Sequence, residues 1–122
     1  MKQNITVLRH LRDVGRDALC VSSVVVGELA FGVARSAETH RARNASTLQS
    51  FLSIVTALPW SVQAAWIYGA HRQRLKVSGT AVGELDLMIG SHALAEGLIL
   101  VTNNTREFAR IDGLRLEDWT AA

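Results

Sequence analysis

The stretch that decides the fold is residues 83–108, GELDLMIGSHALAEGLILVTNNTREF. Its first half predicts a helix, in which Gly90 and Ala93 keep part of the surface flat for close packing. Gly97 is expected to end this helix, because a residue in the left-handed conformation caps the last carbonyls. The continuously apolar run 98–101 then predicts a parallel strand buried on both faces. The apolar residues at helical spacing are Leu85, Met88, Ile89 and Leu94.

Polar side chains follow this strand directly, as Thr102, Asn103 and Asn104. In open α/β sheets, ligands bind beyond the carboxyl ends of the strands, so chemistry is expected here. Asp86 falls in the first turn of the preceding helix, where the helix dipole favours a carboxylate. The stretch therefore predicts both a structural centre and a candidate site.

The rest of the chain alternates short apolar runs with amphipathic segments, which predicts a three-layer α/β fold with a short parallel sheet flanked by helices. No repeat, linker or low-complexity segment interrupts it, so residues 1–122 are expected to form one domain. In the helix capped by Ser61, Val62, Ala65, Trp66, Gly69 and Leu75 are expected to face inward. The expected elements are a helix at 5–14, a strand at 19–21, a helix at 24–34 capped by Ser22 or Ser23, a polar stretch at 35–44 leading into a helix that ends near 53, a strand at 54–58, a helix from 62 to about 76, a loop at 78–83 and an edge strand at 114–116.

The composition narrows the class of protein. With 48% hydrophobic residues, 20% charged residues and a single proline, the chain is not expected to be disordered. A formal charge of +2 is compatible with nucleic acid but is weak evidence for it. No signal peptide or membrane-spanning run is apparent, so we expect a cytoplasmic protein. Cys20 lies in an apolar run and is interpreted as a buried, inert thiol.

Glu28 stands out because it is the only charged residue between Leu19 and Ala34. A carboxylate in so apolar a helix is costly unless it is paired, bound to a metal or at the mouth of a cleft. Glu28 and Asp86 are both expected near strand ends, with the amide of Asn104 close by. Such an oxygen-rich site suits Mg²⁺, which could activate water and stabilise charge on a phosphodiester.

Each of these residues has a structural interpretation as well. Glu28 could pair with a buried arginine, and Asp86 could simply complement the helix dipole. Asn103 and Asn104 could be turn or capping residues, and Glu107 a capping-box or surface acid. No G-x-G-x-x-G or Walker loop is present, which counts against a nucleotide cofactor.

Two segments resemble VapC-type toxins of the PIN-domain ribonuclease family. They are SSVVVGELAFGVARS at 22–36 and ELDLMIGSHALAEGLILVTNNTREFARIDGLRLEDW at 84–119, and the resemblance runs over about 8–119. It implies an endoribonuclease in which acidic residues bind Mg²⁺ or Mn²⁺ to hydrolyse RNA. It also implies a co-expressed antitoxin that blocks the site, and a homodimer to which Trp66, Tyr68 or the helix at 5–14 contributes apolar surface. No membrane association is implied.

The same resemblance assigns roles to individual residues. Glu28 matches the family's helix-borne glutamate and Asp86 its third acidic position. Asn104 falls where many members have a fourth acid, so these three are the implied metal-binding and catalytic residues. The implied substrate contacts are Thr102, Asn103 and Arg35.

The N-terminus departs from the family pattern. Members open with a strand of the type hydrophobic-hydrophobic-Asp-Thr-Asn, which supplies the first metal ligand and lies in the middle of the sheet. Here residues 1–4 lead straight into the helix at 5–14, and no aspartate precedes Asp13. We therefore expect a chain that lacks this strand, is marginally stable alone and binds Mg²⁺ weakly.

The function expected from the sequence is the toxin of a type II toxin–antitoxin system, acting as a Mg²⁺-dependent endoribonuclease whose activity the missing first aspartate would impair. The alternative is a non-catalytic PIN remnant that only binds an antitoxin or another PIN chain. Metal-dependent RNA cleavage by the purified protein distinguishes the two.

Overall fold

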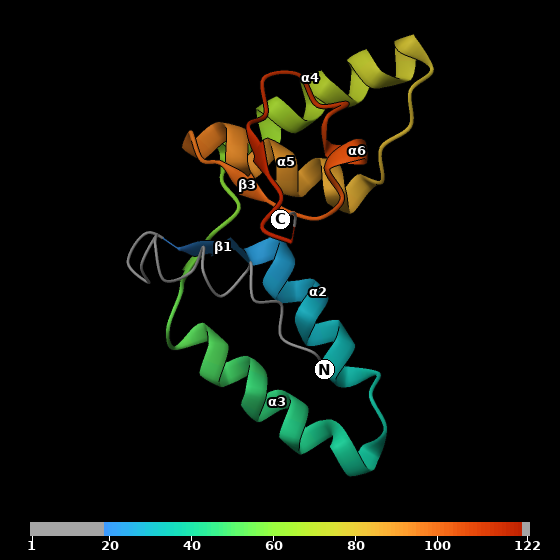
Figure 1. Cartoon of the computed structure of the whole chain (residues 1–122). Helices are drawn as coiled ribbons and strands as arrows, with labels where there is room; N and C mark the ends of the chain where they lie inside the picture. Colours follow the sequence, from blue (N-terminus) through green and yellow to red (C-terminus); the bar gives the residue numbers. More distant parts are fainter. Residues whose placement is uncertain (1–18, 121–122) are drawn as a thin grey trace. The chain divides into compact units, whose positions relative to one another are not determined.

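The structure is a computed structural model that describes residues 19–120. These residues divide into two compact units, an N-terminal unit at 19–59 and a C-terminal unit at 60–120. Each unit has its own two-stranded parallel sheet and its own helices (Figure 1). The predicted α/β class of short parallel strands flanked by helices is confirmed, while the described strands pair as two two-stranded sheets where one sheet was predicted. The helix predicted at 5–14 lies outside the described residues.

The N-terminal unit is a parallel strand pair connected by two helices. Strand β1 (Cys20–Ser22) pairs with β2 (Thr56–Leu58), and the intervening chain forms α2 (Ser23–Ala34) and α3 (Glu38–Leu52). The Ser22 hydroxyl accepts a hydrogen bond from the Val24 amide at 3.1 Å, which confirms Ser22 as the predicted cap of α2. Helix α3 begins earlier than expected, inside the stretch predicted as a polar connector, because its Glu, Arg and Ala residues are good helix formers.

No described residue of the N-terminal unit is buried, although α2 is apolar almost throughout. Phe31 on α2 is 60% exposed. Cys20 is also exposed, so the interpretation of a buried thiol is wrong. The apolar run around Cys20 does form a strand, but the described residues of this unit provide no layer that covers its side chain.

The C-terminal unit begins with two long helices that pack against each other (Figure 1). As predicted, the Ser61 hydroxyl caps the first of them by accepting a hydrogen bond from the Ala64 amide at 3.0 Å. Gly79 and Gly97 end the two helices in the left-handed region, with φ of 72° and 65°. The elements of this unit are α4 (Val62–Ser78), α5 (Glu84–Glu96), β3 (Leu100–Val101), α6 (Thr105–Phe108) and β4 (Leu116–Glu117), with β3 and β4 paired in parallel.

The hydrophobic core of the C-terminal unit is formed by Leu75, Leu87, Phe108 and Ile111. Gly90 allows this close packing, because a Cβ atom placed on it would lie 2.5 Å from Cδ1 of Ile111, and the buried Ile111 side chain would have to shift. The predicted role of Gly90 in close packing is therefore confirmed.

The predicted inward faces of the two long helices are only partly correct. On α4, Leu75 is buried, but Val62 and Trp66 are 76% and 78% exposed. On α5, Leu85 is 45% exposed, whereas Leu87 is 3% exposed. Both helices carry apolar residues on more than one stripe, and the partner helix decides which stripe is buried.

The strand predicted at 98–101 is shorter than expected. Only Leu100–Val101 is a strand, and Leu98, Ile99 and Val101 are each roughly two-fifths exposed. The prediction of burial on both faces is wrong, because β3 belongs to a two-stranded sheet that the described part of the unit covers incompletely. Among the described residues, no helix combines the length and the apolar character needed to cross a membrane.

Candidate functional site

The candidate site lies where the loop at 79–83 enters α5 and meets α6. Glu107 on α6 is its most connected side chain. Its Oε1 accepts a hydrogen bond from the Gly83 amide at 3.0 Å, and its Oε2 accepts one from Nδ2 of Asn104 at 2.8 Å. These two bonds fix both carboxylate oxygens of Glu107 beside the first turn of α5.

Asp86 lies in that first turn, as the sequence predicted. Its carboxyl group lies close to that of Glu107. Oδ2 of Asp86 and Oε1 of Glu107 each lie 3.7 Å from the point where a Cβ atom on Gly83 would stand. The two carboxyl groups therefore meet at one place on the protein surface.

The surroundings favour the charged form of Glu107. The neighbouring Asp86 carboxyl group is the largest cause that lowers the pKa of Glu107 below its ordinary value. The bonds from Gly83 and Asn104 and the nearby Arg110 guanidinium lower this pKa further, while partial desolvation opposes them. The site thus holds negative charge and is supplied with donors that keep it ionised.

The polar residues after β3 form a turn that places Asn104. The Thr102 hydroxyl accepts a hydrogen bond from the Asn104 amide at 3.0 Å, and the Thr102 amide donates to the Glu117 carbonyl at 3.0 Å. Asn104 stands at the N-terminal cap position of α6, but its side chain bonds Glu107 instead of a backbone amide. Asn103 is exposed. Of the predicted site residues, the structure thus brings Asp86, Asn104 and Thr102 into one neighbourhood.

The other two predicted residues belong to the N-terminal unit. Glu28 on α2 is exposed, so the costly apolar burial expected for it is not observed. Arg35 ends α2, and its guanidinium lies 5.6 Å from the centre of the Phe31 ring, a cation–π arrangement. That Glu28 shares a cation with Asp86 stays a prediction.

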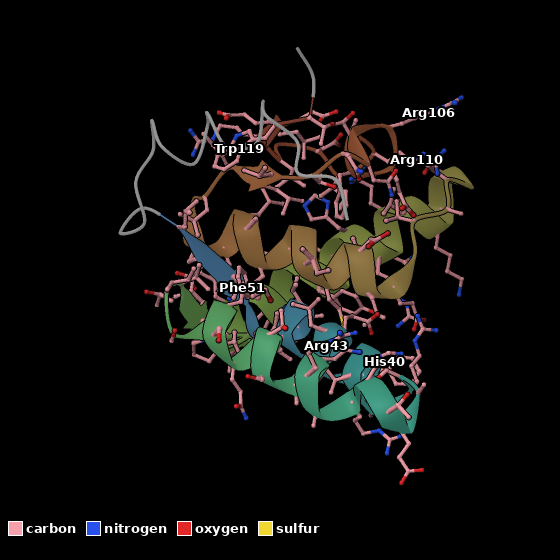
Figure 2. The ribbon with its side chains drawn as sticks, turned by 60° about the horizontal axis from the view of Figure 1, so that its bottom comes forward. His40, Arg43, Phe51, Arg106, Arg110 and Trp119 are labelled. Carbon is pink, nitrogen blue, oxygen red and sulfur yellow. The ribbon has the colours of Figure 1, made fainter. Side chains whose placement is uncertain are left out.

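Further basic side chains of the N-terminal unit lie on α3. Nη2 of Arg43 is 3.0 Å from Nδ1 of His40, and the two residues are neighbours on the helix (Figure 2). Arg41 donates to the Ser36 carbonyl at 3.1 Å. All three are exposed, so this helix presents positive charge to solvent.

Glu107 is a candidate site residue that was not predicted from the sequence. It was interpreted as a capping-box or surface acid, since it stands three residues after Asn104. A capping box would direct Glu107 to the Asn104 backbone amide, yet that amide donates to Thr102. The available signal was the same three-residue spacing, which also places Glu107 and Asn104 on one side of a helical turn.

The donor set suits a hard divalent cation. Asp86 and Glu107 offer carboxylate oxygens, and Asn104 offers an amide oxygen, which are the ligand types preferred by Mg²⁺ and Mn²⁺. Within 19–120 no three or more His, Cys, Asp or Glu side chains are grouped as a ready metal site. The site would offer a cation two carboxylates, from Asp86 and Glu107, and the amide oxygen of Asn104.

Comparison with known proteins gives the family. The PIN-domain family model matches residues 2–114. The chain is 38% identical over 120 residues to the tRNA(fMet)-specific endonuclease VapC of Shigella flexneri, covering 98% of this chain and 89% of that protein. It is 42% identical over 101 residues to ribonuclease VapC2 of Haemophilus influenzae, covering 83% and 75%.

Solved structures agree with the sequence relatives. The DNA-bound VapBC complex of Salmonella typhimurium matches with a TM-score of 0.86 and 39% identity, covering 93% of this chain and 84% of the matched one. VapBC-1 from nontypeable Haemophilus influenzae matches with a TM-score of 0.89 and 28% identity, covering 96% and 87%. The chain belongs to the PIN-domain family, among the VapC-type ribonucleases.

Proposed function

We propose that this chain is the toxin of a type II toxin–antitoxin pair and hydrolyses RNA phosphodiester bonds as a Mg²⁺-dependent endoribonuclease, with Mn²⁺ as a substitute. The observation that carries the proposal is the pair of carboxyl groups, Asp86 and Glu107, that meet beside the Gly83 amide. The Shigella flexneri relative is named a tRNA-specific endonuclease, which supports tRNA as the first substrate to test.

The residues that would hold the cation are Asp86, Glu107 and Asn104, together with Glu28 from the N-terminal unit. When bound, the cation supplies activation of water and stabilisation of charge on the phosphodiester. Thr102 fixes the backbone from which Asn104 reaches the site.

Arg35 and Asn103 are proposed to contact the RNA backbone. Arg35 carries a permanent charge, and both side chains are exposed and able to donate hydrogen bonds to phosphate oxygens. These contacts would position the RNA without reading its sequence.

The Asp86–Glu107 pair explains how the site changes when a cation binds. Two carboxylates this close repel each other when both are ionised. A divalent cation bound between them would offset that repulsion. Since the amide nitrogen of Asn104 bonds Glu107, its carbonyl oxygen is the atom that remains for a cation or for water.

The test is metal-dependent cleavage of tRNA by the purified chain and by variants that keep shape but remove charge. Asp86→Asn and Glu107→Gln are each expected to lower cleavage at least about a hundredfold and to weaken Mg²⁺ binding, because each removes a ligand rather than a supporting group. Glu28→Gln is expected to do the same if Glu28 is a ligand. Circular dichroism checks that each variant is folded.

Glu84→Gln is the matched control. Glu84 lies in the same helical turn as Asp86, but its carboxylate makes an exposed ion pair with Arg72 at 3.2 Å. This variant should retain cleavage and Mg²⁺ affinity. Normal cleavage and normal Mg²⁺ affinity in both Asp86→Asn and Glu107→Gln would overturn the assignment. If the unaltered chain does not cleave RNA but binds its antitoxin, the binding-only function is the correct one.

We further propose that the partner is an antitoxin, that the free toxin is a homodimer, and that both act in the cytoplasm. The solved relatives are VapBC complexes, which supports an antitoxin partner. An arginine of the antitoxin would complement the Asp86–Glu107 pair. Trp66, which is 78% exposed on α4, offers apolar surface for the dimer.

The variant Asp86→Lys should bind the antitoxin much more weakly, since it places a cation where the arginine would dock. Isothermal titration with the antitoxin measures this, and Glu84→Lys is the control on the same turn. Undiminished binding by Asp86→Lys would show that the antitoxin docks elsewhere. Light scattering of the free chain measures the dimer, and a monomer at all concentrations would exclude it.

A further inference from the structure

We propose that Arg110 is a positioning residue that holds the loop at 79–83 so that Asp86 stays beside Glu107. For its effect on catalysis this inference rests on the proposed function, whereas its structural part can be tested without RNA cleavage. Arg110 lies just beyond α6, and its side chain reaches back to the loop that precedes α5.

The first observation is a pair of hydrogen bonds from one turn to one loop. Nη1 of Arg110 donates to the Ala81 carbonyl at 2.6 Å, and Glu107 accepts from the Gly83 amide at 3.0 Å. The Arg110 amide donates to the Glu107 carbonyl at 3.1 Å, so both side chains leave the same turn of backbone. The turn that carries Glu107 and Arg110 therefore holds the loop at two points, the Ala81 carbonyl and the Gly83 amide.

The second observation is that Arg74 contacts the backbone of Arg110 and the side chain of Asp112. The backbone carbonyl of Arg110 lies 3.5 Å from Nη2 of Arg74, while Nη1 of Arg74 forms an ion pair with Asp112 at 3.1 Å. Arg74 is on α4, the helix that leads into the loop. The segment 110–112 thus contacts α4, which precedes the loop, through Arg74. It also contacts the loop itself through the Arg110 side chain.

The loop needs such ties because its own sequence fixes it weakly. It begins and ends with glycine, at Gly79 and Gly83. Gly83 is also the N-terminal cap position of α5, and no side chain caps that helix. The position of Asp86, three residues further on, therefore depends on what holds residues 81–83.

A guanidinium near a nuclease site could instead bind a phosphate of the RNA. The structure favours positioning, since Arg110 donates to a backbone carbonyl of its own chain. Arg106 provides the contrast: it is on α6, and its side chain extends outward on the same side of the unit (Figure 2). Arg106 makes no hydrogen bond or ion pair with the residues that the structure describes.

The experiment compares Arg110→Ala, Arg110→Lys and the control Arg106→Ala in the full chain. Mn²⁺ affinity, measured by titration without RNA, should fall about ten- to hundredfold in Arg110→Ala, as is typical when a group that orients a metal ligand is lost. Amide exchange without metal should become faster at Gly83. Arg110→Lys should behave like Arg110→Ala, because a lysine keeps the charge but not the guanidinium fork.

In RNA cleavage, Arg110→Ala should lower kcat about as much as Mn²⁺ affinity, with KM changed less than about twofold. Arg106→Ala should leave Mn²⁺ affinity and Gly83 exchange unchanged. The inference is overturned if Arg110→Ala raises only KM and Arg110→Lys restores it, which is the behaviour of a phosphate contact. It is also overturned if Gly83 exchange is unchanged in Arg110→Ala, or equally fast in Arg106→Ala. If the unaltered chain cleaves no RNA, the proposed function fails, but Gly83 exchange still decides the role of Arg110.

Discussion

The two units differ most clearly in helices α2 and α5. Helix α2 carries a single charged residue, Glu28, and yet none of its residues is buried. Helix α5 carries Glu84, Asp86 and Glu96 and still buries Leu87 and the run from Gly90 to Ala93. Burial thus follows the surface that a helix packs against, not its average composition.

The candidate site residues of the two units also differ in how firmly the structure holds them. In the C-terminal unit, Asn104 and Glu107 are fixed by hydrogen bonds that also reach the loop at Gly83, and Asp86 lies beside Glu107. In the N-terminal unit, Glu28 and Arg35 are exposed side chains on one helix. A site is specified most sharply where packing has already determined the backbone.

The strongest way to test this comparison is the same substitution in both units. Leu87→Ala should destabilise the C-terminal unit by about 2–5 kcal/mol, because Leu87 is 3% exposed and its removal leaves a cavity in the core. Leu29→Ala, at a residue 41% exposed on α2, should change stability by less than about 0.5–1 kcal/mol.

Tryptophan fluorescence during thermal unfolding reports the stability of the C-terminal unit, since all three tryptophans belong to it. They are Trp60, Trp66 and Trp119. Circular dichroism of the same samples reports the whole chain. Equal losses of stability for Leu87→Ala and Leu29→Ala would show that α2 is buried in solution and would remove the contrast between the units.

A smaller effect, of opposite sign in the two units, is expected for glycine substitutions within helices. Gly90→Ala should destabilise by about 1–3 kcal/mol, because its Cβ would lie 2.5 Å from Cδ1 of Ile111. Gly27→Ala on α2 should stabilise by about 0.5–1 kcal/mol, since no described atom lies within 4 Å of its Cβ position and alanine favours the helix.

Chemical denaturation of both variants gives the sign directly. Gly32→Ala is a second control on α2, because its Cβ position is equally open. A neutral or stabilising Gly90→Ala would mean that α5 and the turn at Ile111 are not in close contact. A destabilising Gly27→Ala together with Gly32→Ala would mean that another surface approaches α2.

Much of the local structure could be predicted from residue chemistry alone. Ser22 and Ser61 begin helices because a hydroxyl satisfies an amide that the helix leaves unpaired. Gly97 ends a helix because it accepts a left-handed backbone without a steric cost. Asp86 and Asn104 could be identified as candidate site residues because each stands at an element boundary, where polar side chains remain accessible.

The partner of Asp86 could not be predicted in this way. Glu107 is distant from Asp86 in the sequence, and its local spacing also suits a capping box. It becomes a site residue because the loop at 79–83 is folded against α6, which depends on contacts such as that of Arg110 with Ala81. The exposure of Trp66 and Cys20 was missed for a related reason, since apolar character alone does not say which surface finds a partner.

The sequence by itself determined the α/β class, where most of the described helices begin and end, and which acidic and amide residues are candidates for a cation site. These properties depend on interactions within a few residues, so the order of residues is sufficient to specify them. Tertiary structure alone decided which helix stripe is buried, why Gly90 cannot be larger and which carboxyl group meets Asp86. Those properties depend on pairs of surfaces far apart in the chain, and their geometry exists only once the surfaces are packed.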